Sequence, residues 1–113
     1  MDLAVEELED GTAKVVLRGR FDTTGSVVIE LPFHKIATER RRIMVDLSAV
    51  TFLSSYGIRV LLVGAKIVSG KGGHMVLLCP DQGVARILRI AGADTLIPTF
   101  QNEAAAAAAL ASS

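Results

Sequence analysis

The segment "DLSAVTFLSSYGIRVLL", residues 46–62, decides the fold because its hydrophobic pattern changes halfway along. An apolar run ends in two serines, a tyrosine and a glycine, and a second apolar run follows them. From Ser55 onward the apolar residues recur at the spacing i, i+3, i+4, i+7 of a buried helix face, at Ile58, Leu61, Leu62 and Ala65. The segment therefore predicts a strand that passes directly into a helix, with hydroxyl groups at the junction.

The residues before this junction predict a hairpin and a helix. Residues 3–8 ("LAVEEL") and 13–19 ("AKVVLRG") have the pattern of two strands, and the Asp10–Gly11 pair between them suits a tight turn. Residues 25–40 are expected to form a helix that is either kinked at Pro32 or begins its regular part there.

Three further segments predict strands. Residues 42–47 ("RIMVDL") and 74–79 ("HMVLLC") are apolar runs typical of strands that are covered on both faces. Residues 94–100 ("DTLIPTF") are expected to form a last strand, which Pro98 places near an edge of the sheet.

Two helices complete the chain. Residues 80–92 predict a short helix whose buried face consists of Val84, Ile87, Leu88 and Ala91. Residues 102–113 are rich in alanine, the best helix former, and should form a terminal helix with little side-chain packing and a frayed far end. The resulting order, ββαβαβαβα, predicts a single α/β domain over residues 1–113, with helices packed on a mixed, mainly parallel sheet.

Composition narrows the class of protein. Half of the 113 residues are hydrophobic, and 12 Lys and Arg balance 12 Asp and Glu, whereas a general nucleic-acid binder normally carries a basic excess. Residues 1–10 lack the pattern of a secretory signal, and Arg59 and Lys66 interrupt the longest apolar region, which falls short of the ~20 residues of a membrane span. The lone Cys79 fits a reducing compartment. We therefore expect a cytoplasmic protein that binds neither nucleic acid nor membrane directly.

The sequence offers few residues for catalysis. His34 and His74 are the only histidines, and no G-x-S-x-G motif surrounds Ser55, so a hydrolase triad is not expected. The "GKGG" segment, residues 70–73, lacks the spacing of a phosphate-binding loop and predicts a helix-ending turn. We expect no enzyme activity, no cofactor and no metal site. A small nucleotide-binding or hydrolytic domain is the alternative from another class.

Three motifs, in the same order along the chain, resemble the STAS domain family, and within it the small stand-alone antagonists of anti-sigma factors. Residues 17–22 ("LRGRFD") are similar to the end of the family's second strand, with its glycine and terminal aspartate. Residues 45–57 ("VDLSAVTFLSSYG") are similar to its strand, serine site and helix start, and residues 84–100 ("VARILRIAGADTLIPTF") to its last helix and strand. The resemblance implies the STAS fold.

The resemblance also implies a bacterial partner-switching protein. The family binds an anti-sigma factor that is also a serine kinase, phosphorylation of one serine breaks the complex, and a PP2C-type phosphatase restores it. That serine aligns with Ser55. The family usually has an aspartate at the position of Ser54, a small residue at Tyr56 and often glycine at Arg59, so Ser54 is an alternative acceptor. STAS accessory or scaffold proteins without a phosphorylation switch, for example cytoplasmic partners of transporters, are the alternative function.

Local physics leaves two roles open for the polar residues at the junction. Ser54 or Ser55 can be the N-cap that accepts from the free amides of the first helical turn. Ser55 can instead be an exposed hydroxyl that takes a phosphate group, which the positive end of a helix tolerates. By the resemblance Asp22 lies near this serine site, or else it caps the helix that follows it.

One face of the helix is expected to form the partner surface. Ser55, Arg59, Val63 and Lys66 recur at spacings of four, four and three, opposite the predicted buried stripe. Val63 has no core to enter there, and Gly57 allows another backbone to approach closely. The predicted partner-binding residues are Asp22, Ser54, Tyr56, Gly57, Arg59, Val63 and Lys66.

Overall fold

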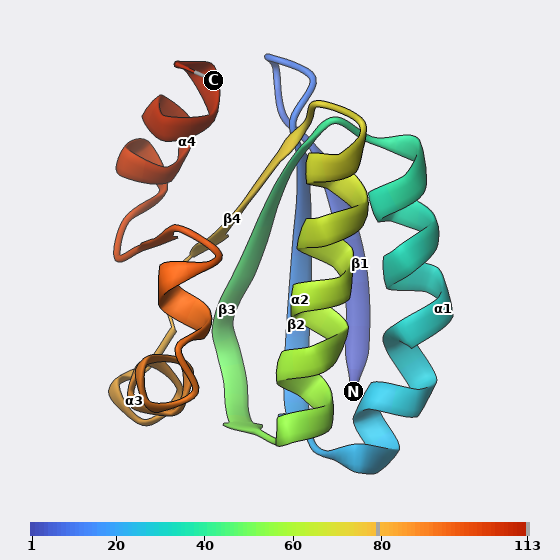
Figure 1. Cartoon of the computed structure of the whole chain (residues 1–113), viewed down its shortest axis with the longest axis vertical. Coiled ribbons are helices and arrows are strands. Elements are labelled where there is room, and N and C mark those ends of the chain that lie inside the picture. Colours follow the sequence, from blue (N-terminus) through green and yellow to red (C-terminus); the bar gives the residue numbers. More distant parts are fainter. Residues whose placement is uncertain (79, 113) are drawn as a thin grey trace.

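A mixed sheet forms the centre of the molecule (Figure 1). The computed structural model describes residues 1–78 and 80–112, and within them five strands pair in the order β1-β2-β3-β4-β5. The strands are β1 Asp2–Glu7, β2 Ala13–Phe21, β3 Arg42–Leu53, β4 His74–Leu78 and β5 Thr99–Phe100. β1 is antiparallel to β2, and the other neighbouring strands are parallel. The predicted mixed, mainly parallel sheet is confirmed.

Helices cover both faces of this sheet. α1 (Thr23–Glu39) and α2 (Ser55–Gly70) lie side by side on one face, and α3 (Gln82–Ile90) packs against β3, with α2 between it and α1 in the view of Figure 1. α4 (Glu103–Ala111) packs on the opposite face, and a short 3-10 helix, η1 (Ala93–Thr95), lies between α3 and β5. The predicted order ββαβαβαβα is confirmed, with η1 as an addition.

The larger core lies between the sheet and helices α1, α2 and α3. Its buried residues are aliphatic or methionine apart from Phe21 and Phe33, which are fully buried. Alternate residues of β3 face different cores, because Ile43 and Val45 belong to the larger one whereas Met44 lies in a smaller core under α4. β3 is therefore covered on both faces over the predicted run, residues 42–47, whereas Ser48, Ala49, Thr51 and Phe52 in its second half are exposed.

α1 is one helix that passes through Pro32. The alternative in which its regular part begins at Pro32 is wrong. Asp22 caps the first turn, so the helix is already fixed nine residues before the proline. Pro32 has no amide hydrogen, so the carbonyl of Val28 has no helical partner. Both residues are exposed, so water can solvate this carbonyl.

The last strand is much shorter than predicted. Of residues 94–100 only Thr99 and Phe100 belong to β5, and residues 93–95 form η1. The carbonyl of Pro98 accepts a hydrogen bond from the amide of Leu77 at 2.9 Å, but a proline has no amide to donate in return. Pairing with β4 therefore starts only after Pro98, and β5 lies at the edge of the sheet, as predicted.

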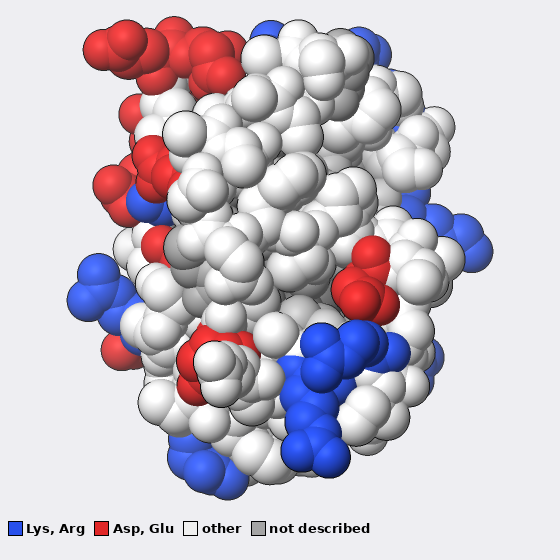
Figure 2. Space-filling model, turned by 90° about the vertical axis from the view of Figure 1, so that its left-hand side faces the viewer, with Lys and Arg blue, Asp and Glu red and all other residues white. Residues whose placement is uncertain are grey.

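The alanine-rich helix packs more tightly than predicted. Ala106 and Leu110 are 0% and 1% exposed and join Met44, Val76 and Leu78 in the smaller core. Small side chains let α4 approach the sheet closely, and the buried Leu110 holds the end that was expected to fray. The outer side of α4 is also alanine, so much of the upper half of the face in Figure 2 carries no charge.

α2 turns a somewhat different face to the core than its apolar stripe predicted. Its buried residues are Gly57, Ile58, Val60, Leu61, Gly64 and Val68. Leu62 and Ala65 are only half-buried at one flank. The helix is rotated toward α1 because Gly64 lies against the ring of Phe33, and a ring nitrogen of His34 lies 3.1 Å from the carbonyl oxygen of Val60.

The face of α3 was predicted more accurately. Val84 and Leu88 are buried and Ile87 is half-buried, but Ala91 is exposed because the helix ends before it. The predicted strand over 74–79 and the predicted helix over 102–113 each end in a residue, Cys79 and Ser113, that lies outside the described residues.

Substitution of Gly64 tests the contact between α1 and α2. A Cβ at this position would overlap the ring of Phe33, which is fully buried. We expect Gly64→Ala to lower the free energy of unfolding by about 1–2 kcal/mol, because overpacking outweighs the gain in helix propensity. Gly70→Ala, at the exposed end of the same helix with open space around it, should be neutral or slightly stabilising. Urea unfolding of the two variants measures the difference, and equal stabilities would contradict the close contact.

Candidate functional site

The two serines at the start of α2 have different positions. Ser54 is the N-cap, and its Oγ accepts a hydrogen bond from the amide of Gly57 at 3.1 Å. Ser55 is the first residue of the helix and is exposed, and its hydroxyl makes no hydrogen bond within residues 1–78 and 80–112. The capping role that the sequence left open between them therefore belongs to Ser54, and the hydroxyl of Ser55 faces solvent.

The strand ends hold this junction in place. The amide of Ser54 donates to the carbonyl of Phe21 at 2.9 Å, which joins the end of β3 to the end of β2. Gly57 is buried against the same strand ends, where a Cβ would lie 2.8 Å from Cδ1 of Phe21 and 2.9 Å from Cδ1 of Leu53. Gly57 is thus needed for packing inside the domain, whereas the sequence suggested an external backbone contact.

Asp22 lies next to the serines and also caps α1. Asp22 directly follows Phe21, whose carbonyl accepts the hydrogen bond from the amide of Ser54. The carboxylate of Asp22 accepts a hydrogen bond from the amide of Gly25 at 2.8 Å. This hydrogen bond, with the Arg20 guanidinium 3.6 Å away, holds the pKa of Asp22 below its usual value. Both roles expected for Asp22, the helix cap and the place near the serine site, are found together.

Tyr56 is tied to α1. Its hydroxyl donates to Oε1 of Glu30 at 2.7 Å, and the neighbouring carboxylate raises the pKa of the tyrosine. The bond places Glu30 beside the start of α2, a position that no sequence pattern predicted, because the two residues are 26 positions apart. Tyr56 thus links the first turn of α2 to α1, directly after the two serines in the chain.

The predicted outward face of α2 is exposed. Arg59 and Lys66 are exposed, and Val63 is 37% exposed, on the same side of the helix as Ser55. Apart from the buried Gly57, the residues predicted for the site thus lie on one region, which starts at the ends of β2 and β3 and follows α2.

Sequence reasoning missed the apolar side chains that α1 adds to this region. Val27 is 61% and Leu31 80% exposed, on the outer side of the helix turn that carries Glu30. Because Glu30 binds Tyr56, these two side chains lie level with the first turn of α2. The signal was present in the sequence, since "VVIEL" places more apolar residues on α1 than one buried face can take.

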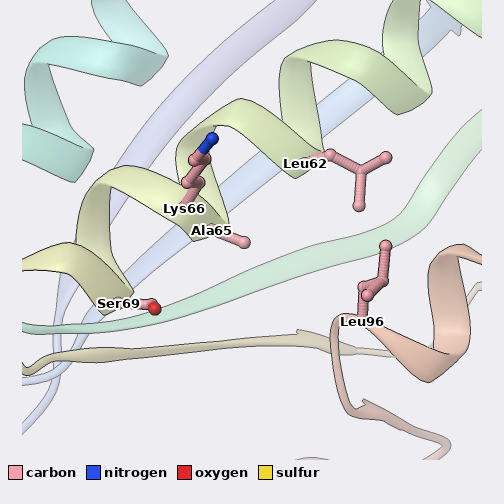
Figure 3. Close-up of a pocket in the computed structure, with 5 residues that line it drawn as sticks. All are labelled: Leu62, Ala65, Lys66, Ser69 and Leu96. Atoms are coloured by element: carbon pink, nitrogen blue, oxygen red, sulfur yellow. The ribbon is translucent and has the colours of Figure 1, made fainter.

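A surface cavity of about 350 Å³ lies on the other flank of α2 (Figure 3). Leu62 and Leu96 point toward each other across it, and Ala65, Lys66 and Ser69 complete its lining. A site for a polar small molecule has several convergent polar groups, and this lining lacks them. The cavity therefore offers apolar contact area beside the exposed face.

Two further kinds of site receive no support from the described part of the chain. No group of three or more His, Cys, Asp or Glu there could hold a metal ion. No helix there combines the length and the hydrophobicity that crossing a membrane requires.

A mixed sheet with this element order, and an exposed serine where β3 passes into α2, define the STAS class of α/β domain. Comparison with known families agrees, because residues 4–106 match the STAS domain. The chain belongs to the STAS domain family.

Individual relatives point to one group within the family. The chain is 30% identical over 107 residues to an anti-sigma F factor antagonist of Paenibacillus polymyxa, with 91% of each chain covered. Its fold is similar to that of an anti-sigma factor antagonist from Mycobacterium paratuberculosis, with a TM-score of 0.88, 23% identity and coverage of 96% and 92%. It is also similar to the phosphorylated form of the Bacillus cell fate determinant SpoIIAA, with a TM-score of 0.70, 17% identity and coverage of 92% and 96%.

Replacing each serine by alanine distinguishes the cap from the free hydroxyl. We expect Ser54→Ala to lower the free energy of unfolding by about 1 kcal/mol, because the amide of Gly57 loses its acceptor. Ser55→Ala should change it by less than about 0.5 kcal/mol, because an exposed hydroxyl without a partner is removed. Thermal or urea unfolding measures both. A larger effect at Ser55 would show that the cap has been assigned to the wrong serine.

Proposed function

We propose that this protein is an anti-sigma factor antagonist whose binding is switched off by phosphorylation of Ser55. Its partner is an anti-sigma factor that is also a serine kinase, and a PP2C-type phosphatase restores the binding form. The observation that carries the proposal is the exposed Ser55 hydroxyl at the start of α2, left free because Ser54 provides the cap. The 30% identical relative named as an anti-sigma F factor antagonist and the phosphorylated SpoIIAA structure support it.

Phosphorylation of Ser55 is compatible with the fold. In the transfer, Oγ of Ser55 bonds to the γ-phosphorus of ATP, ADP leaves, and the hydroxyl proton passes to a base of the kinase. The product places an anion at the positive end of α2, where the macrodipole favours negative charge. Because Ser54 holds the amide of Gly57, the phosphate displaces no hydrogen bond of the folded domain.

The same phosphate is costly within an interface. It adds about −1.5 to −2 charge and three acceptor oxygens. Covering such a group without a compensating cation from the partner costs several kcal/mol. Since ~1.4 kcal/mol is a tenfold change in affinity, the modification is large enough to separate the two proteins.

The docking surface in this proposal extends over two helices. α2 contributes Arg59, Val63 and Lys66 around and beyond Ser55, and α1 contributes the exposed Val27 and Leu31. An apolar area with cations at its border is typical of protein interfaces. The protein acts in this proposal as a cytoplasmic binding module, without catalysis or a cofactor of its own.

A STAS accessory or scaffold protein is the second candidate. It is favoured by the bulky Tyr56, which is tied to Glu30 and stands where the antagonists usually have a small residue, and by Ser54 at the position where they usually have an acid. In that function the same surface binds its partner permanently.

Incubation with candidate kinase-type anti-sigma factors and ATP tests the switch. We expect mass spectrometry to find one phosphate, on Ser55, and pull-down to show that Ser55→Glu no longer binds whereas Ser55→Ala binds regardless of ATP. Phosphate on Ser54 would identify the alternative acceptor. Binding without phosphate would support the scaffold function, and a failure of every such kinase to bind would overturn the antagonist assignment.

Charge placed on the apolar part of the surface tests its role in docking. We expect Leu31→Asp and Val63→Asp each to weaken binding of the anti-sigma factor about tenfold or more, because a carboxylate must then be desolvated. Their thermal midpoints should stay close to that of the wild type, since both side chains are exposed. Ala108→Asp is the control, because it puts the same charge on exposed α4 at the other side of the sheet. Calorimetric titration measures the affinities, and a large loss of stability in Val63→Asp would show that Val63 belongs to the core.

A further inference from the structure

Arg59 lies where it can reach a group attached to Ser55. The two residues are four positions apart on α2, and both are exposed. Residues at this spacing on a helix have Cβ atoms ~5–6 Å apart, and an acid placed four positions before a base is the favourable order. Arg59 has no carboxylate within ion-pair distance in the described part of the chain.

The other charged groups around the junction are acids or are already engaged. Asp22 caps α1, and Glu30 accepts from Tyr56. Arg20 pairs with Asp22, and its guanidinium carbon lies 4.6 Å from the centroid of the Phe52 ring. A phosphate on Ser55 thus enters a region with two carboxylates, and the free cation nearest to it along α2 is Arg59.

We propose that Arg59 is the counter-cation of the phosphoryl group on Ser55. In the unmodified protein its guanidinium is free to meet an acidic side chain of the partner. In the phosphorylated protein it pairs with the phosphate on its own helix, so that phosphorylation both adds a dianion and withdraws a cation from the docking surface. The inference rests on the proposed function, because it needs Ser55 to be the phosphorylated residue.

Lys66 supplies a matched control for this arrangement. It is an exposed cation on the same face of α2, but it lies eleven residues after Ser55, which is ~16 Å along the helix. A side chain at that distance is beyond the Debye length of ~8–10 Å at physiological salt, and its effect on the phosphate is screened.

Phosphoserine installed at position 55 of the full chain by genetic code expansion allows a direct test without kinase or partner. The probe is the phosphate itself, titrated between pH 4 and 8 by ³¹P NMR in the wild type, Arg59→Gln, Arg59→Lys and Lys66→Gln. We expect the second pKa of the phosphate to be about 0.3 higher in Arg59→Gln than in the wild type, because the dianion loses its cation. Arg59→Lys should retain most of the wild-type value, and Lys66→Gln should match it.

A second signal confirms that the side chain itself moves. The Nε–H resonance of Arg59 should shift on phosphorylation in the wild type, and 1 M NaCl should reduce both this shift and the pKa difference. Equal phosphate pKa values in the wild type and Arg59→Gln, with no shift of the Nε–H resonance, overturn the proposal. That result leaves the kinase assay untouched, whereas failure of the kinase assay leaves the NMR result valid, so the two proposals fail separately.

Discussion

The hydrogen bond from the amide of Ser54 to the carbonyl of Phe21 fixes the geometry on which the rest of the site depends. It joins the ends of two parallel strands, β2 and β3, at the point where each gives way to a helix. Because a single residue separates β3 from α2, the helix has no freedom to start elsewhere. Ser54 is then in position to cap, and Ser55 necessarily faces outward. Ser55, the candidate phosphate acceptor, is thus exposed because of the way β2 and β3 pair.

Two glycines allow α2 to lie in the place that this junction gives it. Gly57 brings the first turn against Phe21 and Leu53, and Gly64 brings the third turn against Phe33. Larger side chains at either point would lift the helix from the sheet or separate it from α1. The outer face of α2 carries none of these constraints, which leaves it free to serve recognition. The inner face of α2 is therefore closely packed, whereas residues on its outer face can vary without disturbing the packing.

Local patterns in the sequence predicted the alternation of strands and helices, the edge position of the last strand and the exposed side of α2. These features depend on residues that are near one another in the chain, such as the spacing of Ile58 and Leu61 or the proline at 98. The bond between Tyr56 and Glu30 could not be predicted, because it depends on how two helices align across the sheet. The same reason explains the missed packing of Ala106 under β4, which depends on tertiary contacts that override the small size of alanine. The sequence alone did not show whether Ser54 or Ser55 is the N-cap of α2, because this depends on the residue at which β3 ends.

The shortness of β5 has a consequence for self-association. Its two residues pair only with Leu77 and Leu78, so the outer edge of β4 between His74 and Val76 has no strand neighbour in the described chain. A bare edge of this kind is a template on which a strand of another copy can align. Here Leu96, Pro98 and Ala109 line the recess at that edge. A second chain that adds a strand there has to fit between these residues and β4, so the recess limits the approach of another copy to one narrow stretch of the edge.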